Sequence, residues 1–309
     1  MDFNNLVFPA PSNPISMLDY KNEIIYIPRN KQDKYKENSN VNTESDSTKD
    51  YIPALLLLTS QEYISKNFCI YFHGNAEDIF IARDLADKLR FCFDLNILIV
   101  EYPGYSLYFD EKNCETVLDN SVIAFDFLVE ELNISPENIL VIGRSIGTGP
   151  ACYLGSKRNP EGIVLISPFT SIRSIAERIV GGFFKYLISE QFENIKFVKD
   201  IASPVLFIHG QLDELIPFDH TIKLKDECKC PYEVILPENM NHNDFNLDED
   251  FLIPIRNFMK RFTRLKNHNY FALNHILVPE IYKIVPYCVE EKIIKSDRVS
   301  KESFMNCCQ

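Results

Sequence analysis

No run of apolar residues in the 309-residue chain approaches the roughly 18 that a membrane-spanning helix requires. The first residues, MDFNNLVFPAPSNP, have neither a basic segment nor a long apolar stretch and therefore do not predict a secretory signal. Asp2 stands where N-myristoylation would need glycine. These absences predict a cytosolic protein. Its nine cysteines are expected to be reduced thiols, because their odd number and irregular spacing do not suit a disulfide framework.

Basic residues are also in deficit. The chain has 32 lysines and arginines against 44 aspartates and glutamates, so its formal net charge at pH 7 is −12. Binding of nucleic-acid phosphates needs a basic surface, and this balance argues against a nucleic-acid partner. The chain does have 46% hydrophobic and 25% charged residues, a composition that excludes a disordered chain and allows a large core.

Short apolar runs of strand length alternate with stretches of helical pattern. Strands are predicted over residues 51–60, 68–72, 97–102, 139–143, 163–167, 205–210 and 232–236. Helices are predicted over residues 77–91, 114–132, 146–157, 218–227 and 249–263. Continuous apolar strands that alternate with helices predict an α/β fold, in which a mostly parallel central sheet carries helices on both faces.

The remaining segments flank this predicted core, which spans residues 51–263. Residues 1–50 include a strand-like segment and then residues 31–50, which are rich in Asn, Ser, Lys and Asp. Because so few apolar residues cannot order that stretch, we interpret it as an insertion in a hairpin connection. Residues 264–309 form a C-terminal extension whose last part is polar.

The pattern Gly-x-Ser-x-Gly occurs at residues 143–147 (GRSIG), directly after a predicted strand and before a predicted helix. This context is typical of a nucleophile elbow, a tight turn that lifts a serine hydroxyl clear of the sheet. Glycines flank the serine because side chains there would collide with neighbouring backbone. We predict that Ser145 is a nucleophile. The Ile146 backbone N–H, at the start of the helix, is predicted to donate to an oxyanion.

A serine hydroxyl is a poor nucleophile near neutral pH and needs a base. In this architecture an acid and then a histidine follow the serine along the chain. We favour His242 as the base, because it lies in a loop between the last predicted strand and the last core helix. The other histidines after the serine lie in a strand, in a helix or beyond the core, and are His209, His220, His268 and His275. We interpret His209 as a packed strand residue.

The acid is expected to orient that base. Asp213 follows a predicted strand closely, and ligands of open parallel sheets bind beyond the carboxyl ends of the strands. Glu214 is its immediate competitor. Asp244 and Asp248 are too close to His242 in the chain to be preferred. We therefore predict that Asp213 is the orienting carboxylate.

The second oxyanion donor is expected in the loop after the predicted strand 68–72, where the sequence reads His73-Gly74-Asn75-Ala76. Gly74 would let the backbone approach a substrate. The Asn75 backbone N–H is our first choice of donor, with Ala76 as the alternative. We interpret His73 as a structural side chain that holds this loop through hydrogen bonds.

These residues lie in segments that resemble the α/β-hydrolase superfamily, and within it the α/β-hydrolase-domain-17 group. The resemblance runs from about residue 50 to residue 263, and FPAP at 8–11 is similar to the group's N-terminal segment. Its motifs are YFHGNAED (71–78), EYPGYS (101–106), GRSIGTGPA (143–151), SPFTSIRSIA (167–176), PVLFIHGQLDELIP (204–217) and MNHNDF (240–245). The resemblance implies an α/β-hydrolase fold with a catalytic triad at Ser145, Asp213 and His242.

The resemblance also implies a serine hydrolase, for which no metal or organic cofactor is expected. Protein depalmitoylation, the cleavage of a thioester on an S-acylated cysteine, is the activity associated with animal members of the group. Two other functions stay open. One is a carboxylesterase or lipase that acts on small acyl esters with the same triad. The other is a catalytically silent scaffold, against which the ordered presence of all three triad residues argues.

The sequence indicates less about substrate binding than about the catalytic residues. Residues 168–200 fill the place where this fold often inserts lid elements. Phe183, Phe184, Tyr186 and Leu187 are candidates for lining an acyl groove there. The alternative is that these side chains only pack the core and the cap.

Two pairs of cysteines stand out among the nine. Cys228 and Cys230 have no second pair at zinc-site spacing, so we interpret them as free thiols. Cys307 and Cys308 lie just before the last residue. Animal members of the resembled group are anchored by lipidated N-terminal cysteines, which this chain lacks. The terminal pair is therefore a candidate anchor for peripheral membrane association, since two acyl chains suffice for stable binding. Ordinary exposed thiols are the alternative.

Overall fold

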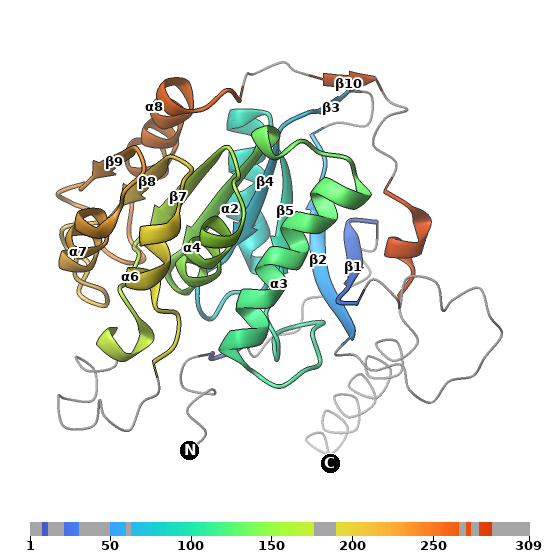
Figure 1. Ribbon diagram of the computed structural model, residues 1–309, viewed down its shortest axis with the longest axis horizontal. Coiled ribbons are helices and arrows are strands. Elements are labelled where there is room, and N and C mark those ends of the chain that lie inside the picture. The colour runs from blue at the N-terminus through green and yellow to red at the C-terminus, as the bar shows by residue number, and fades with distance from the viewer. Residues whose placement is uncertain are drawn as a thin grey trace, which may run out of the picture.

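The central sheet has the strand order β1-β2-β5-β4-β6-β7-β8-β9 (Figure 1). The computed structural model describes residues 8–11, 22–30, 50–59, 63–175, 190–265, 270–272 and 278–285. The sheet strands are β1 (Ile24–Pro28), β2 (Tyr51–Leu57), β4 (Phe68–Phe72), β5 (Asn96–Val100), β6 (Ile139–Arg144), β7 (Gly162–Ile166), β8 (Val205–Ile208) and β9 (Tyr232–Ile235). Strand β2 is antiparallel to β1 and β5, and every other neighbouring pair is parallel. The predicted mostly parallel sheet is confirmed.

The strands are apolar throughout because both faces of the sheet are buried. In β4, Phe68, Ile70 and Phe72 point into one hydrophobic cluster. Cys69 and Tyr71, the alternate residues of the same strand, point into the other. Successive side chains of a strand point to opposite faces, so a strand covered on both sides has no position for an exposed polar residue.

Helices cover both faces, as the sequence predicts. They are α2 (Ile79–Phe93), α3 (Cys114–Asp126), α4 (Thr148–Lys157), α6 (Asn194–Phe197), α7 (Asp219–Glu227) and α8 (Ile253–Phe262). Buried residues of α3, α4 and α7 belong to one cluster, and those of α2 and α8 belong to the other. Figure 1 shows α3 and α4 in front of the sheet and α2 behind it.

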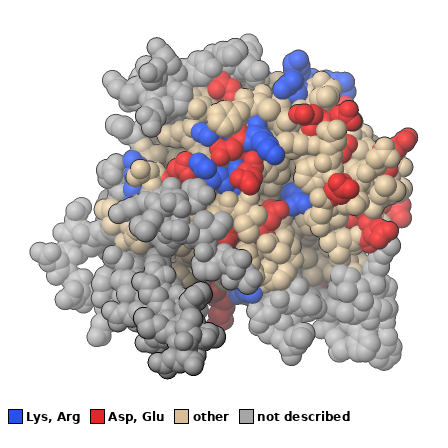
Figure 2. All heavy atoms as spheres, turned by 180° about the vertical axis from the view of Figure 1, so that it is seen from behind, with Lys and Arg blue, Asp and Glu red and all other residues tan. Residues whose placement is uncertain are grey.

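The rear face carries charges of both signs. Seen from behind, acidic and basic residues lie next to one another in the middle of the face, and mainly acidic residues lie toward the right of the view (Figure 2). On α2, Arg83 pairs with Glu23 at 2.8 Å and Arg90 pairs with Asp87 at 2.6 Å. Among the residues that the structure describes, no helix has the length and apolar character needed to cross a membrane.

Two features of the fold depart from the predicted elements, a small second sheet and π-helical turns at the ends of two helices. A two-stranded sheet, β3 (Tyr63–Ser65) with β10 (Tyr270–Ala272), was not predicted. Its strands are too short for a hydrophobic period and lie far apart in the chain. Two predicted helices contain π-helical turns, at Phe127–Glu131 after α3 and at Leu247–Leu252 before α8. The interpretation of 31–50 as an insertion concerns residues almost wholly outside the described ones, but the strands on either side, β1 and β2, are antiparallel neighbours.

The parallel strands gather the candidate residues at one edge of the sheet. Ser145 follows β6 directly, Asp213 lies five residues after the end of β8, and His242 lies seven residues after the end of β9. The carboxyl ends of parallel strands meet at the same edge, which is where open α/β sheets bind ligands.

Candidate active site

Ser145 occupies a strained turn between β6 and the helical turn that leads into α4. Its φ is +53°, a left-handed conformation that is uncommon for residues other than glycine. A Cβ at Gly143 would lie 2.4 Å from the Gly147 carbonyl oxygen, and a Cβ at Gly147 would lie 2.2 Å from the Phe72 carbonyl oxygen. Both glycines are therefore required by close backbone contacts, as the motif predicts. The turn has the geometry of a nucleophile elbow.

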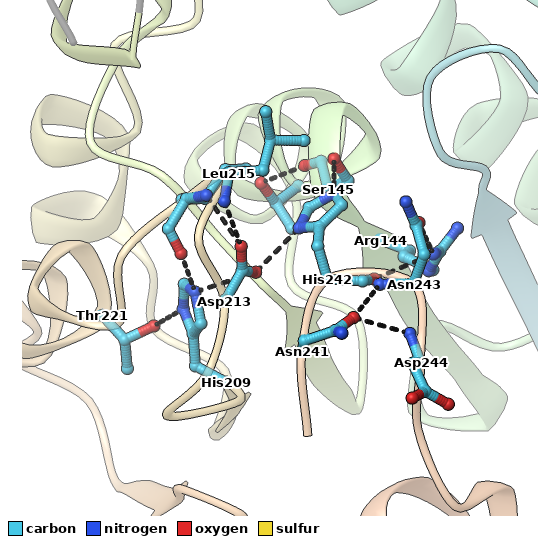
Figure 3. Close-up of polar contacts among 12 residues, drawn as sticks. Arg144, Ser145, His209, Asp213, Leu215, Thr221, Asn241, His242, Asn243 and Asp244 are labelled. Atoms are coloured by element: carbon cyan, nitrogen blue, oxygen red, sulfur yellow. Dashed lines mark hydrogen bonds and ion pairs between the residues drawn. The ribbon is translucent and has the colours of Figure 1, made fainter. Parts of the chain in front are cut away.

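The structure brings Ser145, His242 and Asp213 into one hydrogen-bonded series (Figure 3). The distance from Ser145 Oγ to His242 Nε2 is 3.0 Å, and that from His242 Nδ1 to Asp213 Oδ2 is 2.7 Å. A carboxylate oxygen can only accept, so Nδ1 carries the ring proton and donates it to Asp213. Nε2 is then left to accept the proton of the Ser145 hydroxyl. This tautomer is the one a general base needs.

Asp213 is held by both of its oxygens. Oδ1 accepts the backbone N–H groups of Leu215 and Ile216 at 3.0 and 2.7 Å. Burial alone would raise the pKa of this carboxyl, but hydrogen bonds from His209 and His242 hold it well below its usual range. Its neighbour Glu214 is exposed to solvent. Of the two carboxylates that the sequence left in competition, only Asp213 faces the base.

His209 is a residue whose connection to the site the sequence did not reveal. It is fully buried, as predicted, but its Nε2 lies 3.4 Å from Asp213 Oδ2 and 2.7 Å from the Ile216 carbonyl oxygen. Both of those atoms are acceptors, so Nε2 carries the proton and Nδ1 accepts from the Thr221 hydroxyl at 2.7 Å (Figure 3). His209 thus supports the carboxylate from the side opposite His242. Its place at the end of a buried strand, four residues before Asp213, was the one available signal.

The loops that carry the acid and the base are packed against each other. A Cβ at Gly210 would lie 2.1 Å from the Met240 carbonyl oxygen. That same carbonyl accepts the Leu212 backbone N–H at 3.0 Å. The base loop is closed further along, where Asn241 Oδ1 accepts the backbone N–H groups of the two residues that follow His242. The separation between acid and base is therefore set by backbone contacts.

The loop after β4 lies beside the elbow and has a buried charged support. His73 Nδ1 lies 3.0 Å from the Gly74 carbonyl oxygen, and its Nε2 lies 3.2 Å from Glu101 Oε1. Both partners are acceptors, so a doubly protonated ring satisfies them together. Burial would lower the pKa of His73, but the hydrogen bond and the charge of Glu101 raise it overall. The Tyr102 hydroxyl also donates to the His73 carbonyl oxygen. His73 holds this loop, as predicted.

Of the two predicted oxyanion donors, Asn75 lies in this loop and Ile146 lies in the elbow. Ile146 is the second residue of the elbow turn and is buried. The Asn75 side-chain oxygen accepts from the Tyr105 hydroxyl at 2.9 Å and from the Ala76 backbone N–H at 3.3 Å. The Ala76 N–H is thus engaged within the loop, and the choice between Asn75 and Ala76 as the second donor stays a prediction.

The remaining candidates either have other partners or are outside the residues that the structure describes. His220 Nδ1 accepts from the backbone N–H and the hydroxyl of Thr170. Cys228 and Cys230 are free thiols with their Sγ atoms 3.2 Å apart. Among the described residues, no group of three or more His, Cys, Asp or Glu side chains could hold a metal ion. Two sets of predicted residues lie outside the described ones, the groove candidates Phe183, Phe184, Tyr186 and Leu187 and the terminal pair Cys307 and Cys308. The histidines His268 and His275 also lie outside them.

The strand order, the two helical layers and the arrangement at the elbow define the class of this protein as an α/β hydrolase. The chain is similar in fold to the esterase Pf2001 of Pyrococcus furiosus, with a TM-score of 0.60 and 15% identity. That comparison covers 82% of this chain and 98% of the esterase.

Sequence comparison identifies the family within that class. The chain is 30% identical over 197 residues to human alpha/beta hydrolase domain-containing protein 17B. That alignment covers 64% of this chain and 67% of the relative. The chain is 32% identical over 198 residues to the Xenopus laevis protein of the same name, covering 63% and 67% of the two chains. No family model matches the chain. The chain belongs to the alpha/beta hydrolase domain-containing protein 17 family, and this membership, like the fold, supports a hydrolase.

Proposed function

We propose that this protein is a serine hydrolase that cleaves acyl thioesters or esters through a triad of Ser145, His242 and Asp213. The observation that carries the proposal is the hydrogen-bonded series of these residues at a strained elbow, with Nε2 of the base aimed at the serine hydroxyl. A nucleophile within hydrogen-bond reach of a base that a third group orients is the arrangement that nucleophilic catalysis requires.

The proposed reaction starts with attack of Ser145 Oγ on the acyl carbonyl carbon, while His242 Nε2 takes the hydroxyl proton. The tetrahedral intermediate collapses when the bond to the leaving group breaks, and His242 returns that proton to the thiolate or alkoxide. A water molecule then attacks the acyl-enzyme, with His242 again taking and returning a proton, and releases the carboxylic acid. Asp213 holds the histidine tautomer and stabilises the imidazolium in both half-reactions.

The backbone N–H groups of Asn75 and Ile146 are the proposed donors to the oxyanion. They stand on two different strand ends, β4 and β6, which pair in parallel with Phe72 opposite Gly143. The backbone of Gly147 also lies directly against that of Phe72, so the two loops begin close together. One such donor contributes about 3–4 kcal/mol to stabilisation of the transition state.

For the substrate we propose an S-acylated protein, so that the reaction is a depalmitoylation. Membership of the family and the resemblance of the motifs around the triad support this class of substrate. Peripheral association with the cytosolic face of a membrane, through lipidation of Cys307 and Cys308, would place the enzyme near such substrates. A general carboxylesterase that acts on small acyl esters is the competing activity.

The nucleophile is tested by labelling with a fluorophosphonate probe. Ser145→Ala should abolish labelling of the folded protein, and retained labelling would overturn the assignment. Ser167→Ala is the matched control, because Ser167 directly follows the neighbouring strand β7, is buried and has a φ of +49°, yet its Oγ has no hydrogen-bond partner. This control should be labelled like the unmodified protein.

The substrate class is tested separately by comparing an S-palmitoylated peptide with a p-nitrophenyl ester. A kcat/KM that is clearly higher for the thioester would support depalmitoylation. A preference for the short ester would favour the carboxylesterase, with the same dependence on Ser145 in both cases.

A further inference from the structure

Arg144, the residue directly before the proposed nucleophile, has no part in the mechanism above but is nearly inaccessible to solvent. Its exposed fraction is 8%. Arginine is rarely buried to this degree unless its guanidinium is paired. The residue ends β6, and its side chain lies on the same side of the site as the base loop (Figure 3).

The guanidinium of Arg144 divides its donors between two loops. Nη2 donates to the backbone carbonyl of His242 at 3.2 Å and to Asn243 Oδ1 at 3.0 Å. Nη1 donates to Glu77 Oε1 at 2.5 Å. The first two contacts hold the loop of the proposed base at His242 itself and at the next residue. The third reaches the loop after β4.

The Glu77 contact extends to the proposed oxyanion donor. The second oxygen of Glu77, Oε2, accepts the Gly74 backbone N–H at 3.0 Å. Gly74 directly precedes Asn75, so the carboxylate holds the backbone of this loop at the residue before the proposed donor. A Cβ at Gly74 would lie 2.8 Å from Nη1 of Arg144, which shows how closely the loop backbone approaches the guanidinium.

We infer that Arg144 is a positioning residue that sets the base loop and the oxyanion loop in register with the nucleophile of its own strand. The inference rests on the proposed function. A planar guanidinium can serve two loops at once because its donors point outward in a fixed fork, whereas a lysine ammonium is a single point charge. A displacement of catalytic groups by about 1 Å can lower a rate about 100-fold.

The test compares Arg144→Ala and Arg144→Lys with the unmodified protein in acyl hydrolysis and in probe labelling. We expect kcat to fall about 100-fold in both variants with KM little changed, because the groups displaced act on the transition state. Labelling of Ser145 should be slower but should still reach completion. Millimolar guanidinium should restore a substantial part of kcat to Arg144→Ala and none to Arg144→Lys, where the side chain still fills the position.

Arg158→Lys is the matched control. Arg158 makes a two-pronged ion pair with Asp126, with both distances 2.7 Å, between α4 and α3. This variant loses an arginine fork away from the site and should keep its kcat. Glu77→Gln keeps the shape of its side chain, but it removes the charge and replaces one of the two acceptor oxygens, which serve Arg144 and the Gly74 N–H, by a donor NH2 group. It provides a second test if the Arg144 variants fold poorly. We expect a fall in kcat of about 10-fold or more for Glu77→Gln.

The outcomes separate the two hypotheses. Absence of labelling and hydrolysis in the unmodified protein would overturn the proposed function itself. A labelled, active protein in which Arg144→Lys and Glu77→Gln keep normal kcat would overturn only the positioning role. A loss of kcat that guanidinium does not restore, and that matches the loss of folded protein in thermal unfolding, would also overturn it and leave Arg144 with a structural role.

Discussion

Replacement of Asp213 by asparagine should leave the site folded but reverse the tautomer of the base. Oδ1 of Asp213 accepts two backbone N–H groups, whereas Oδ2 faces the ring nitrogens of His242 and His209. An asparagine must keep its oxygen toward the two N–H groups, since leaving the buried Ile216 N–H unpaired costs about 1–3 kcal/mol. Its NH2 group then faces His242 Nδ1 and donates to it. The ring proton moves to Nε2, which can no longer accept from Ser145.

The expected loss follows from this geometry. An active site that is intact but holds the wrong histidine tautomer loses about 10⁴-fold in kcat, which corresponds to about 5 kcal/mol of transition-state stabilisation. The assay is steady-state hydrolysis of an acyl ester or thioester near neutral pH, with thermal unfolding to verify the fold. Glu214→Gln is the control and should keep full activity, because Glu214 is exposed. A loss below about 10-fold in Asp213→Asn would refute the assigned role of this carboxylate.

The pH dependence of the unmodified protein offers a second view of the same residue. The pKa of Asp213 is held below its usual range in the folded protein. A carboxyl with a lowered pKa adds stability that is present above its ordinary pKa of about 3.9 and is lost only as the pH falls through the folded value. Activity that declines in mild acid should therefore follow a different group. An acid limb should therefore still be present in the residual activity of Asp213→Asn, which has no carboxyl at this position.

Three further outcomes are expected. The stability that His73 gains from Glu101 should be largest below the ordinary histidine pKa of about 6.5 and should fall as the pH rises through its raised folded value. Urea unfolding of His73→Gln beside the unmodified protein measures it, and a difference that grows with pH would contradict the assignment. Gly147→Ala should lower the free energy of unfolding by about 1–3 kcal/mol or more, because the new Cβ meets backbone at the end of β4; an unchanged denaturation midpoint would contradict this. Replacement of Cys307 and Cys308 together by serine should abolish membrane fractionation, and unchanged fractionation would refute the proposed anchor.

Local pattern was enough to locate most of the elements near the site. The predicted strand 139–143 is β6, which runs one residue further to Arg144, and the predicted helix 218–227 is α7, Asp219–Glu227. These predictions succeeded because strands buried on both faces are apolar without interruption and therefore stand out from amphipathic helices. The elbow was also predicted from the sequence. Its two glycines are required by backbone contacts, one made within the motif itself and one made with the end of the adjacent strand.

Contacts between segments that are distant in the chain could not be predicted from local pattern. In the sequence, Arg144 is a variable position of a five-residue motif. Its neighbours in the chain do not indicate that it contacts Glu77 and the loop of His242. His209 read as a packed strand residue, which it is, but its contact with Asp213 depends on how the chain turns after β8. The pairing of β3 with β10 likewise joins short segments that have no pattern of their own.

The sequence by itself determined which segments would become buried strands, which serine would stand at a strained turn and which residue types could serve it. Only the tertiary structure decided that Asp213 rather than Glu214 faces His242, and that the base, 97 positions after Ser145, comes within 3.0 Å of its hydroxyl. The physical reason is the parallel order β6-β7-β8-β9, which places the carboxyl ends of these strands at one edge of the sheet. The loops beyond that edge are then held in place by backbone contacts and by one buried guanidinium.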